Sequence, residues 1–257
     1  MRILHIGDII GATGRKAVKS FLPDVRRQYR PDIIVANAEN ASGGFGITYA
    51  VYEELKKLDI DIMTTGNHIW DNRETELSIH KMDTLIRPAN LPEGVPGNGT
   101  ITIEKNGEKF TVINLIGRVY MSLSDCPFRK FDSMIKDTEG FVMVDFHAEA
   151  TSEKAAFGFY ADGRAACVVG THTHVQTADE RILDKGTLFL TDVGMCGARN
   201  SVIGMEKEAP IERFLKGMPR KFEVEKRGKM MFNALFFEYD SSVGVTDFAR
   251  ISVTSGD

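Results

Sequence analysis

The run Asp32-Ile33-Ile34-Val35-Ala36-Asn37-Ala38-Glu39-Asn40 joins an apolar segment to a carboxylate and an amide, and it indicates the fold. Its four apolar residues, 33–36, predict a buried strand. Similar apolar runs lie on either side of it, at residues 3–6 and 60–64. Helical spacing fills the two intervals, at 11–29 and at 48–58, although Pro23 is expected to start, kink or interrupt the first helix. This alternation predicts an α/β fold with a largely parallel sheet covered by helices.

The remaining chain predicts a second set of strands and helices. Asn106-Gly107 is a strong hairpin signal between the strands expected at 100–104 and 109–115. The other expected elements are helices at 128–136 and 152–160, strands at 141–146 and 165–169, a hairpin around 184–186, and strands at 230–239 and 249–253. No internal repeat or linker interrupts the sequence. We therefore expect one domain over residues 1–257, with two packed sheets between helices.

The composition is that of an ordinary globular protein. The 257 residues are 42% hydrophobic and 26% charged, with a formal net charge of −4. This charge argues against a general nucleic-acid coat protein but leaves room for a nucleotide or an RNA end at a local cationic site. Three widely spaced cysteines argue against a disulfide framework. No signal peptide and no apolar run of about 18 residues is evident, so we expect a cytoplasmic protein without a membrane span.

Polar side chains that can perform chemistry follow the predicted strands at their carboxyl ends. These residues are Asp8, Glu39, Asn40, Asn67, His68, His147, His172 and His174. In open α/β sheets, ligands bind outside the carboxyl ends of the strands. Five strand ends that each deliver a carboxylate, amide or imidazole therefore predict one shared site.

The pair His172 and His174 is the sharpest metal signal, because it follows the apolar run 165–169. Residues two apart on a strand point to the same side, so both imidazoles are expected to grip one ion. The mixed oxygen and nitrogen donors suit iron, manganese or zinc, and their number favours two metals that share a carboxylate. Asp8 and Glu39 balance two of the four positive charges, and a bridging hydroxide and a phosphodiester can balance the rest.

Several sequence runs together resemble a known family. They are Ile6-Gly7-Asp8-Ile9-Ile10-Gly11, Asn37-Ala38-Glu39-Asn40-Ala41, Thr65-Gly66-Asn67-His68, Asp145-Phe146-His147-Ala148-Glu149 and Gly170-Thr171-His172-Thr173-His174. They resemble the calcineurin-like metallophosphoesterases and, more closely, the YmdB-like branch, described as cyclic-nucleotide phosphodiesterases. The general pattern expects a histidine at position 10 and a bridging aspartate, where this chain has Ile10 and Glu39. The departure at Glu39 is itself typical of the YmdB-like branch.

The resemblance implies a four-layer αββα sandwich and an assignment of each candidate residue. Asp8, Glu39, Asn40 and His174 would hold one metal, and Glu39, Asn67, His147 and His172 the other. His68 would not bind metal but would protonate the leaving alkoxide. The metals would be iron (Fe²⁺/Fe³⁺) or manganese, the substrates 2′,3′- or 3′,5′-cyclic nucleotides such as cyclic AMP, and the protein a homo-oligomer.

Other functions fit the same residues. A phosphomonoesterase, or a nuclease acting on RNA ends, could use the same two metals. A non-enzymatic, metal-dependent regulator is a third interpretation, although a purely structural site has no need of His68. Among the remaining histidines, His5 is expected to pack structurally and His80 to lie on the surface.

Overall fold

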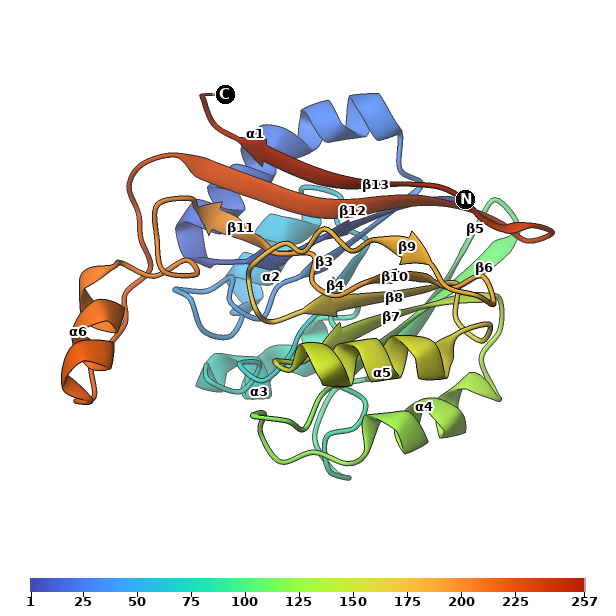
Figure 1. Cartoon of the computed structure of the whole chain (residues 1–257), viewed down its shortest axis with the longest axis horizontal. Helices are drawn as coiled ribbons and strands as arrows, with labels where there is room; N and C mark the ends of the chain where they lie inside the picture. The colour runs from blue at the N-terminus through green and yellow to red at the C-terminus, as the bar shows by residue number, and fades with distance from the viewer. Residues whose placement is uncertain (257) are drawn as a thin grey trace.

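The fold has four layers, with two sheets face to face and helices on both outer sides (Figure 1). The computed structural model describes residues 1–256. Helices α1 and α2 pack on the first sheet, while α4 and α5 cover the second. The predicted four-layer αββα sandwich is therefore confirmed.

The first sheet contains the chain's first strands together with its last ones. Its members are β1 (Arg2–Ile6), β2 (Asp8–Ile9), β3 (Ile33–Asn37), β4 (Ile62–Thr64), β11 (Met195–Ala198), β12 (Met230–Asp240) and β13 (Gly244–Thr254). The strand order is β2-β11-β12-β1-β3-β4, with β13 beside β12. The strands β1, β3 and β4 run parallel, as predicted, whereas β12 pairs antiparallel with both β1 and β13.

The second sheet is built from the middle of the chain. Its strands are β5 (Thr100–Lys105), β6 (Glu108–Ile116), β7 (Phe141–His147), β8 (Cys167–Thr171), β9 (Arg181–Ile182) and β10 (Leu188–Leu190), in the order β5-β6-β7-β8-β10-β9. Both predicted hairpins form, since β5 pairs antiparallel with β6 and β9 with β10. The parallel strands β6, β7 and β8 direct their carboxyl ends to one edge.

The helices are short apart from the first. They are α1 (Gly11–Tyr29), α2 (Tyr49–Lys56), α3 (Arg73–Ser78), the 3₁₀ helix η1 (Ile79–Lys81), α4 (Pro127–Ile135), α5 (Thr151–Ala161) and α6 (Glu208–Lys216). Thr48 caps α2 as expected, because its side chain accepts a hydrogen bond from the Val51 amide. None of the helices within residues 1–256 could cross a membrane.

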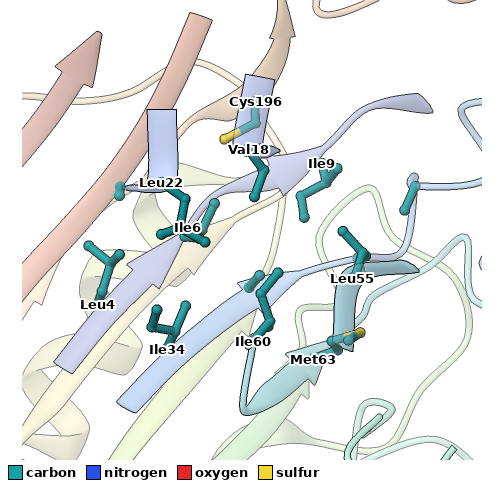
Figure 2. Packing of buried hydrophobic residues seen from close by; sticks show 14 of the residues in the cluster. Leu4, Ile6, Ile9, Val18, Leu22, Ile34, Leu55, Ile60, Met63 and Cys196 are labelled. Carbon is teal, nitrogen blue, oxygen red and sulfur yellow. The ribbon is translucent and has the colours of Figure 1, made fainter. Parts of the chain in front are cut away.

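Three clusters of buried apolar residues fill the spaces between the layers, and a fourth, smaller cluster includes Ile10 and Met205. Leu4, Ile34 and Leu22 belong to the cluster between the first sheet and its helices (Figure 2). Residues on the opposite sides of the same strands, including Ile3 and Ile33, face the second sheet. This alternation along β1 and β3 is the period-two pattern of a strand buried on both sides.

The expected break at Pro23 is wrong. Helix α1 continues through Pro23 without interruption, because Pro23 and Lys19, whose carbonyl loses its partner, both face solvent. The strand expected at 165–169 forms as β8, with both bounds shifted by two residues. Helix α6 and the strands β2 and β11 were not predicted.

Candidate metal centre

The candidate residues lie at one edge of the sandwich and come from both sheets. Asp8 follows β1, Glu39 and Asn40 follow β3, and Asn67 and His68 follow β4 of the first sheet. The second sheet contributes His147 at the end of β7, and His172 and His174 just beyond β8. The site therefore spans the junction between the two sheets.

The tightest group of donors surrounds Nε2 of His147. This nitrogen lies 3.0 Å from Glu39 Oε1, 2.9 Å from Asn67 Oδ1 and 3.1 Å from His172 Nδ1. Glu39 and His147 are fully buried, and His172 is partly buried. A carboxylate, an amide oxygen and two imidazoles can together hold a divalent cation such as iron, manganese or zinc.

A buried hydrogen-bond chain leaves Nε2 of His147 free to bind a metal. The Thr171 hydroxyl donates to Asp145 Oδ1 at 2.7 Å, so it accepts a hydrogen bond from Nδ1 of His147 at 2.9 Å. The His147 proton is thereby placed on Nδ1. Asp145 is fixed in turn by His5 Nε2 at 3.1 Å and by the Thr64 hydroxyl. His5 is thus structural, as expected.

Replacing Thr171 with valine tests this chain, because valine keeps the shape but offers no acceptor to His147. We expect Thr171→Val to weaken Mn²⁺ binding by about 10- to 100-fold, the usual effect of losing a partner that orients a ligand. Isothermal titration calorimetry of the metal-stripped protein measures the affinity for Mn²⁺. Thr246→Val, at an exposed position of β13, is the matched control and should leave the affinity unchanged.

A second group of donors lies beside the first, around Asp8, Asn40 and His174. His174 Nε2 is 3.4 Å from Asn40 Nδ2 and 3.7 Å from Asp8 Oδ1, while its Nδ1 donates to the Ile203 carbonyl at 2.8 Å. Asp8 Oδ1 and Asn40 Oδ1 are buried without a hydrogen-bond partner among residues 1–256. Unsatisfied buried oxygens are costly, and a bound cation would satisfy both.

The two histidines after β8 reach the site by a different route from the one predicted. The strand ends at Thr171, and both His172 (φ 100°) and His174 (φ 64°) adopt positive φ values. The directions of the two side chains are therefore set by a strained loop and not by strand alternation. The Thr173 amide between them donates to Asp192 Oδ2 at 3.1 Å, and the buried Lys154 ammonium lies 2.6 Å from the same oxygen.

His68 lies at the site but outside the two donor groups. Its amide donates to Glu39 Oε2 at 2.9 Å, while Nδ1 of its ring donates to Asp71 Oδ2 at 2.7 Å. The ring is about one-third exposed and lies edge-on to Phe45 at 5.2 Å. Gly66 allows this turn, since a Cβ there would come within 2.1 Å of His147 Cδ2. One turn can thus direct Asn67 toward His147 and leave His68 facing the pocket.

The site's electrostatics favour a bound cation. Burial raises the pKa of Glu39, but the charges of His147 and His68 outweigh it and lower the value to about 2. Burial lowers the pKa of His147, yet Glu39 and Asp8 raise it to about 8. His147 thus attracts a second proton at the point where the donors converge, and the same field attracts a metal ion. Burial and His147 lower the pKa of His172 to about 3, leaving a neutral imidazole.

Burial shifts the pKa values of Asp8 and His174 so that both groups favour their neutral forms. Burial raises the pKa of Asp8 well above its ordinary value, because the attraction of His147 is too small to offset it. Burial likewise lowers the pKa of His174. Both buried groups therefore resist ionisation as long as no cation compensates them.

A pocket of about 930 Å³ opens from the donors toward solvent. Asn40, His68, His172 and His174 line its inner end. Residues 210–222, including part of α6, form its outer wall, for which the sequence indicated no role. The sequence likewise indicated no role for Asp145, Thr171 or Lys154. A carboxylate inside an apolar strand was a usable signal for Asp145, whereas nothing in the sequence marks Lys154 as buried.

Comparisons with known proteins agree over nearly the whole chain. The profile of a family described as YmdB-like protein matches residues 4–251, which include every candidate ligand. A 2′,3′-cyclic-nucleotide 2′-phosphodiesterase from Bacillus subtilis (strain 168) is 46% identical over 243 residues, covering 93% of this chain and 92% of that protein.

Two crystal structures share the fold closely. A hypothetical protein from Thermus thermophilus has a TM-score of 0.94 at 40% identity, with 99% of both chains covered. A novel phosphatase from Mycoplasma pneumoniae has a TM-score of 0.93 at 35% identity, covering 99% of this chain and 93% of that one.

Proposed function

The chain belongs to the YmdB-like family and is a hydrolase of phosphoester bonds, and on this premise we propose that it is a metal-dependent phosphodiesterase of cyclic nucleotides. The observation that carries the proposal is the convergence of Glu39, Asn67 and His172 on Nε2 of His147, with His172 also lining the pocket. The name of the Bacillus subtilis relative supports 2′,3′-cyclic nucleotides as the substrate class. A 3′,5′-cyclic nucleotide such as cyclic AMP is the second candidate.

The proposed metal ligands fall into the two donor groups described above. Asp8, Glu39, Asn40 and His174 would hold one ion, and Glu39, Asn67, His147 and His172 would hold the other. Iron or manganese is proposed, because both accept mixed oxygen and imidazole donors. When bound, the ions supply a nucleophilic hydroxide near neutral pH and neutralise charge on the phosphate.

His68 is proposed as the proton donor. Hydrolysis adds water to phosphorus and breaks one P–O bond, so the departing ribose oxygen must gain a proton. His68 lines the pocket beside the donors without belonging to them, and its Nδ1 is paired with Asp71. The hydrogen bond to Asp71 engages Nδ1 and orients the ring, so Nε2 is the nitrogen available to the leaving oxygen.

Metal removal and reconstitution test the proposed function. We expect protein reconstituted with Mn²⁺ or Fe²⁺ to hydrolyse 2′,3′-cyclic AMP, and chelation to abolish turnover, with the product identified by chromatography. Readdition of metal should restore activity. If the metal-loaded protein acts only on phosphomonoesters such as AMP, the phosphodiesterase assignment is wrong and a phosphomonoesterase takes its place.

A further inference from the structure

The pocket extends well beyond the donors, and its outer part has a distinct chemistry. Its volume of about 930 Å³ is near the upper end for small-molecule sites. The outer wall comes from residues 210–222, where α6 stands apart from the two sheets (Figure 1). A cyclic mononucleotide bound at the donors therefore leaves this wall free for further contacts.

The outer wall is cationic in an otherwise acidic chain. Residues 207–221 contain five Lys or Arg and two Glu, whereas the whole chain has a net charge of −4. Arg220 lines the pocket but is paired with Glu212 at 2.7 Å. Arg213 and Lys221 also line it, and neither has an ion-pair partner among residues 1–256. Two unpaired cationic side chains beside a site that hydrolyses phosphoesters indicate that the pocket takes a ligand with a second phosphate group.

Aromatic side chains lie beside these cations. Phe214 of α6 lines the pocket with 86% of its surface exposed, and Phe45 lines it with 36% exposed. Phe222, partly buried, lies 5.5 Å from the Arg213 guanidinium. Exposed aromatic rings beside a cationic wall are the usual means of binding single-stranded nucleic acid, because bases stack on the rings while the cations contact phosphates.

The chemistry of a 2′,3′-cyclic phosphate indicates which nucleic acid would carry both phosphates. A 2′,3′-cyclic phosphate forms when a ribose 2′ hydroxyl attacks the adjacent phosphodiester, so it arises first at the 3′ end of an RNA fragment. Such an end presents the cyclic phosphate, a second phosphate on its 5′ side, and at least two bases. Deoxyribose has no 2′ hydroxyl, so DNA cannot form this end.

We propose that the pocket takes the 3′ end of a single RNA strand that terminates in a 2′,3′-cyclic phosphate. The cyclic phosphate lies at the metal ligands and the preceding phosphate against Arg213 and Lys221, with bases on the outer aromatic rings. Water adds to phosphorus, the P–O2′ bond breaks, and O2′ takes the proton of His68, which leaves a 3′-phosphate. This inference rests on the proposed phosphodiesterase function.

The test compares substrates that differ only on the 5′ side of the cyclic phosphate. They are 2′,3′-cyclic AMP, its 5′-phosphorylated form, and an RNA hexamer ending in a 2′,3′-cyclic phosphate. At low salt we expect kcat/KM for the hexamer to exceed that of 2′,3′-cyclic AMP by about tenfold. The advantage should shrink as salt rises, with a logarithmic slope of about 0.7 per phosphate contact on a single strand.

Paired variants locate the contact. Arg213→Gln combined with Lys221→Gln should lower kcat/KM for the hexamer about tenfold more than for 2′,3′-cyclic AMP. It should also weaken binding of a 5′-fluorescein hexamer ending in 3′-phosphate, measured by anisotropy. The control, Lys207→Gln with Lys226→Gln, removes two exposed charges on either side of residues 210–222, outside the pocket lining, and should change neither value.

Three outcomes would overturn the inference, and they are distinguishable. A hexamer no better than 2′,3′-cyclic AMP, with a ratio that the double variant leaves unchanged, rejects the RNA end and leaves the phosphodiesterase standing. Equal kcat/KM for the 5′-phosphorylated mononucleotide and the hexamer assigns the second phosphate to a mononucleotide instead. No hydrolysis of any cyclic substrate by metal-loaded protein rejects the proposed function itself.

Discussion

His68→Ala is expected to lower kcat for 2′,3′-cyclic AMP by about 10²- to 10⁴-fold while the protein keeps its metal, because this is the usual contribution of a positioned proton donor. The imidazole is not among the donors that converge on His147, so its loss removes no ligand. The bond from the residue-68 amide to Glu39 Oε2 uses the backbone and survives the substitution.

Steady-state kinetics and elemental analysis of the same preparation check this result. His80→Ala is the matched control, since His80 is an exposed histidine of η1 outside the pocket lining, and it should retain full activity. Loss of metal together with activity in His68→Ala would contradict the assignment of His68 as a proton donor that binds no metal.

Glu39→Gln is expected to weaken metal binding by more than about 100-fold and to abolish turnover at limiting metal. Glu39 is the carboxylate that contacts both His147 and the His68 amide, and its low pKa keeps it ionised. Glutamine removes that negative charge and replaces one acceptor oxygen with a donor. Changes to residues that merely orient ligands cost about 10- to 100-fold, so loss of a direct ligand should cost more.

Isothermal titration calorimetry measures this loss of metal affinity, and circular dichroism shows whether the variant folds. Glu149→Gln provides a graded comparison, because Glu149 lies 3.2 Å from His172 Nε2 but is about half exposed. Solvent screens the contact between Glu149 and His172, so Glu149→Gln should weaken metal binding less than Glu39→Gln does. Equal losses in both variants would remove the special role proposed for Glu39.

The fold was largely predictable because its core elements depend on local patterns. The apolar run at 33–36 and its neighbours at 3–6 and 60–64 became β3, β1 and β4 with boundaries shifted by at most two residues. Helix α6 was not predicted because Pro210 is its only buried residue, so it has no apolar stripe facing the core. Helix α1 continues through Pro23 on its exposed side, and the sequence does not reveal which side of the helix faces solvent there.

The gathering of candidate ligands followed from the rule that parallel strands deliver their carboxyl ends to one edge. The finer geometry depended on contacts between residues far apart in sequence. Thr171 orients His147 across 24 positions, and Lys154 supports Asp192 across 38. Likewise, the positive φ values of His172 and His174 arise in a loop held by Asp192, so strand periodicity could not anticipate them.

The junction between the sheets has a consequence for the tolerance of the site to distant change. The proposed ligands are divided between the two sheets, and the apolar layer that contains Ile33, Val35 and Met143 sets the distance between the sheets. A misplacement of about 1 Å in a reacting group can cost roughly 10²-fold in rate. We therefore expect this apolar layer to set the spacing of the proposed ligands, so that removing a methyl group from it alters catalysis without changing any ligand.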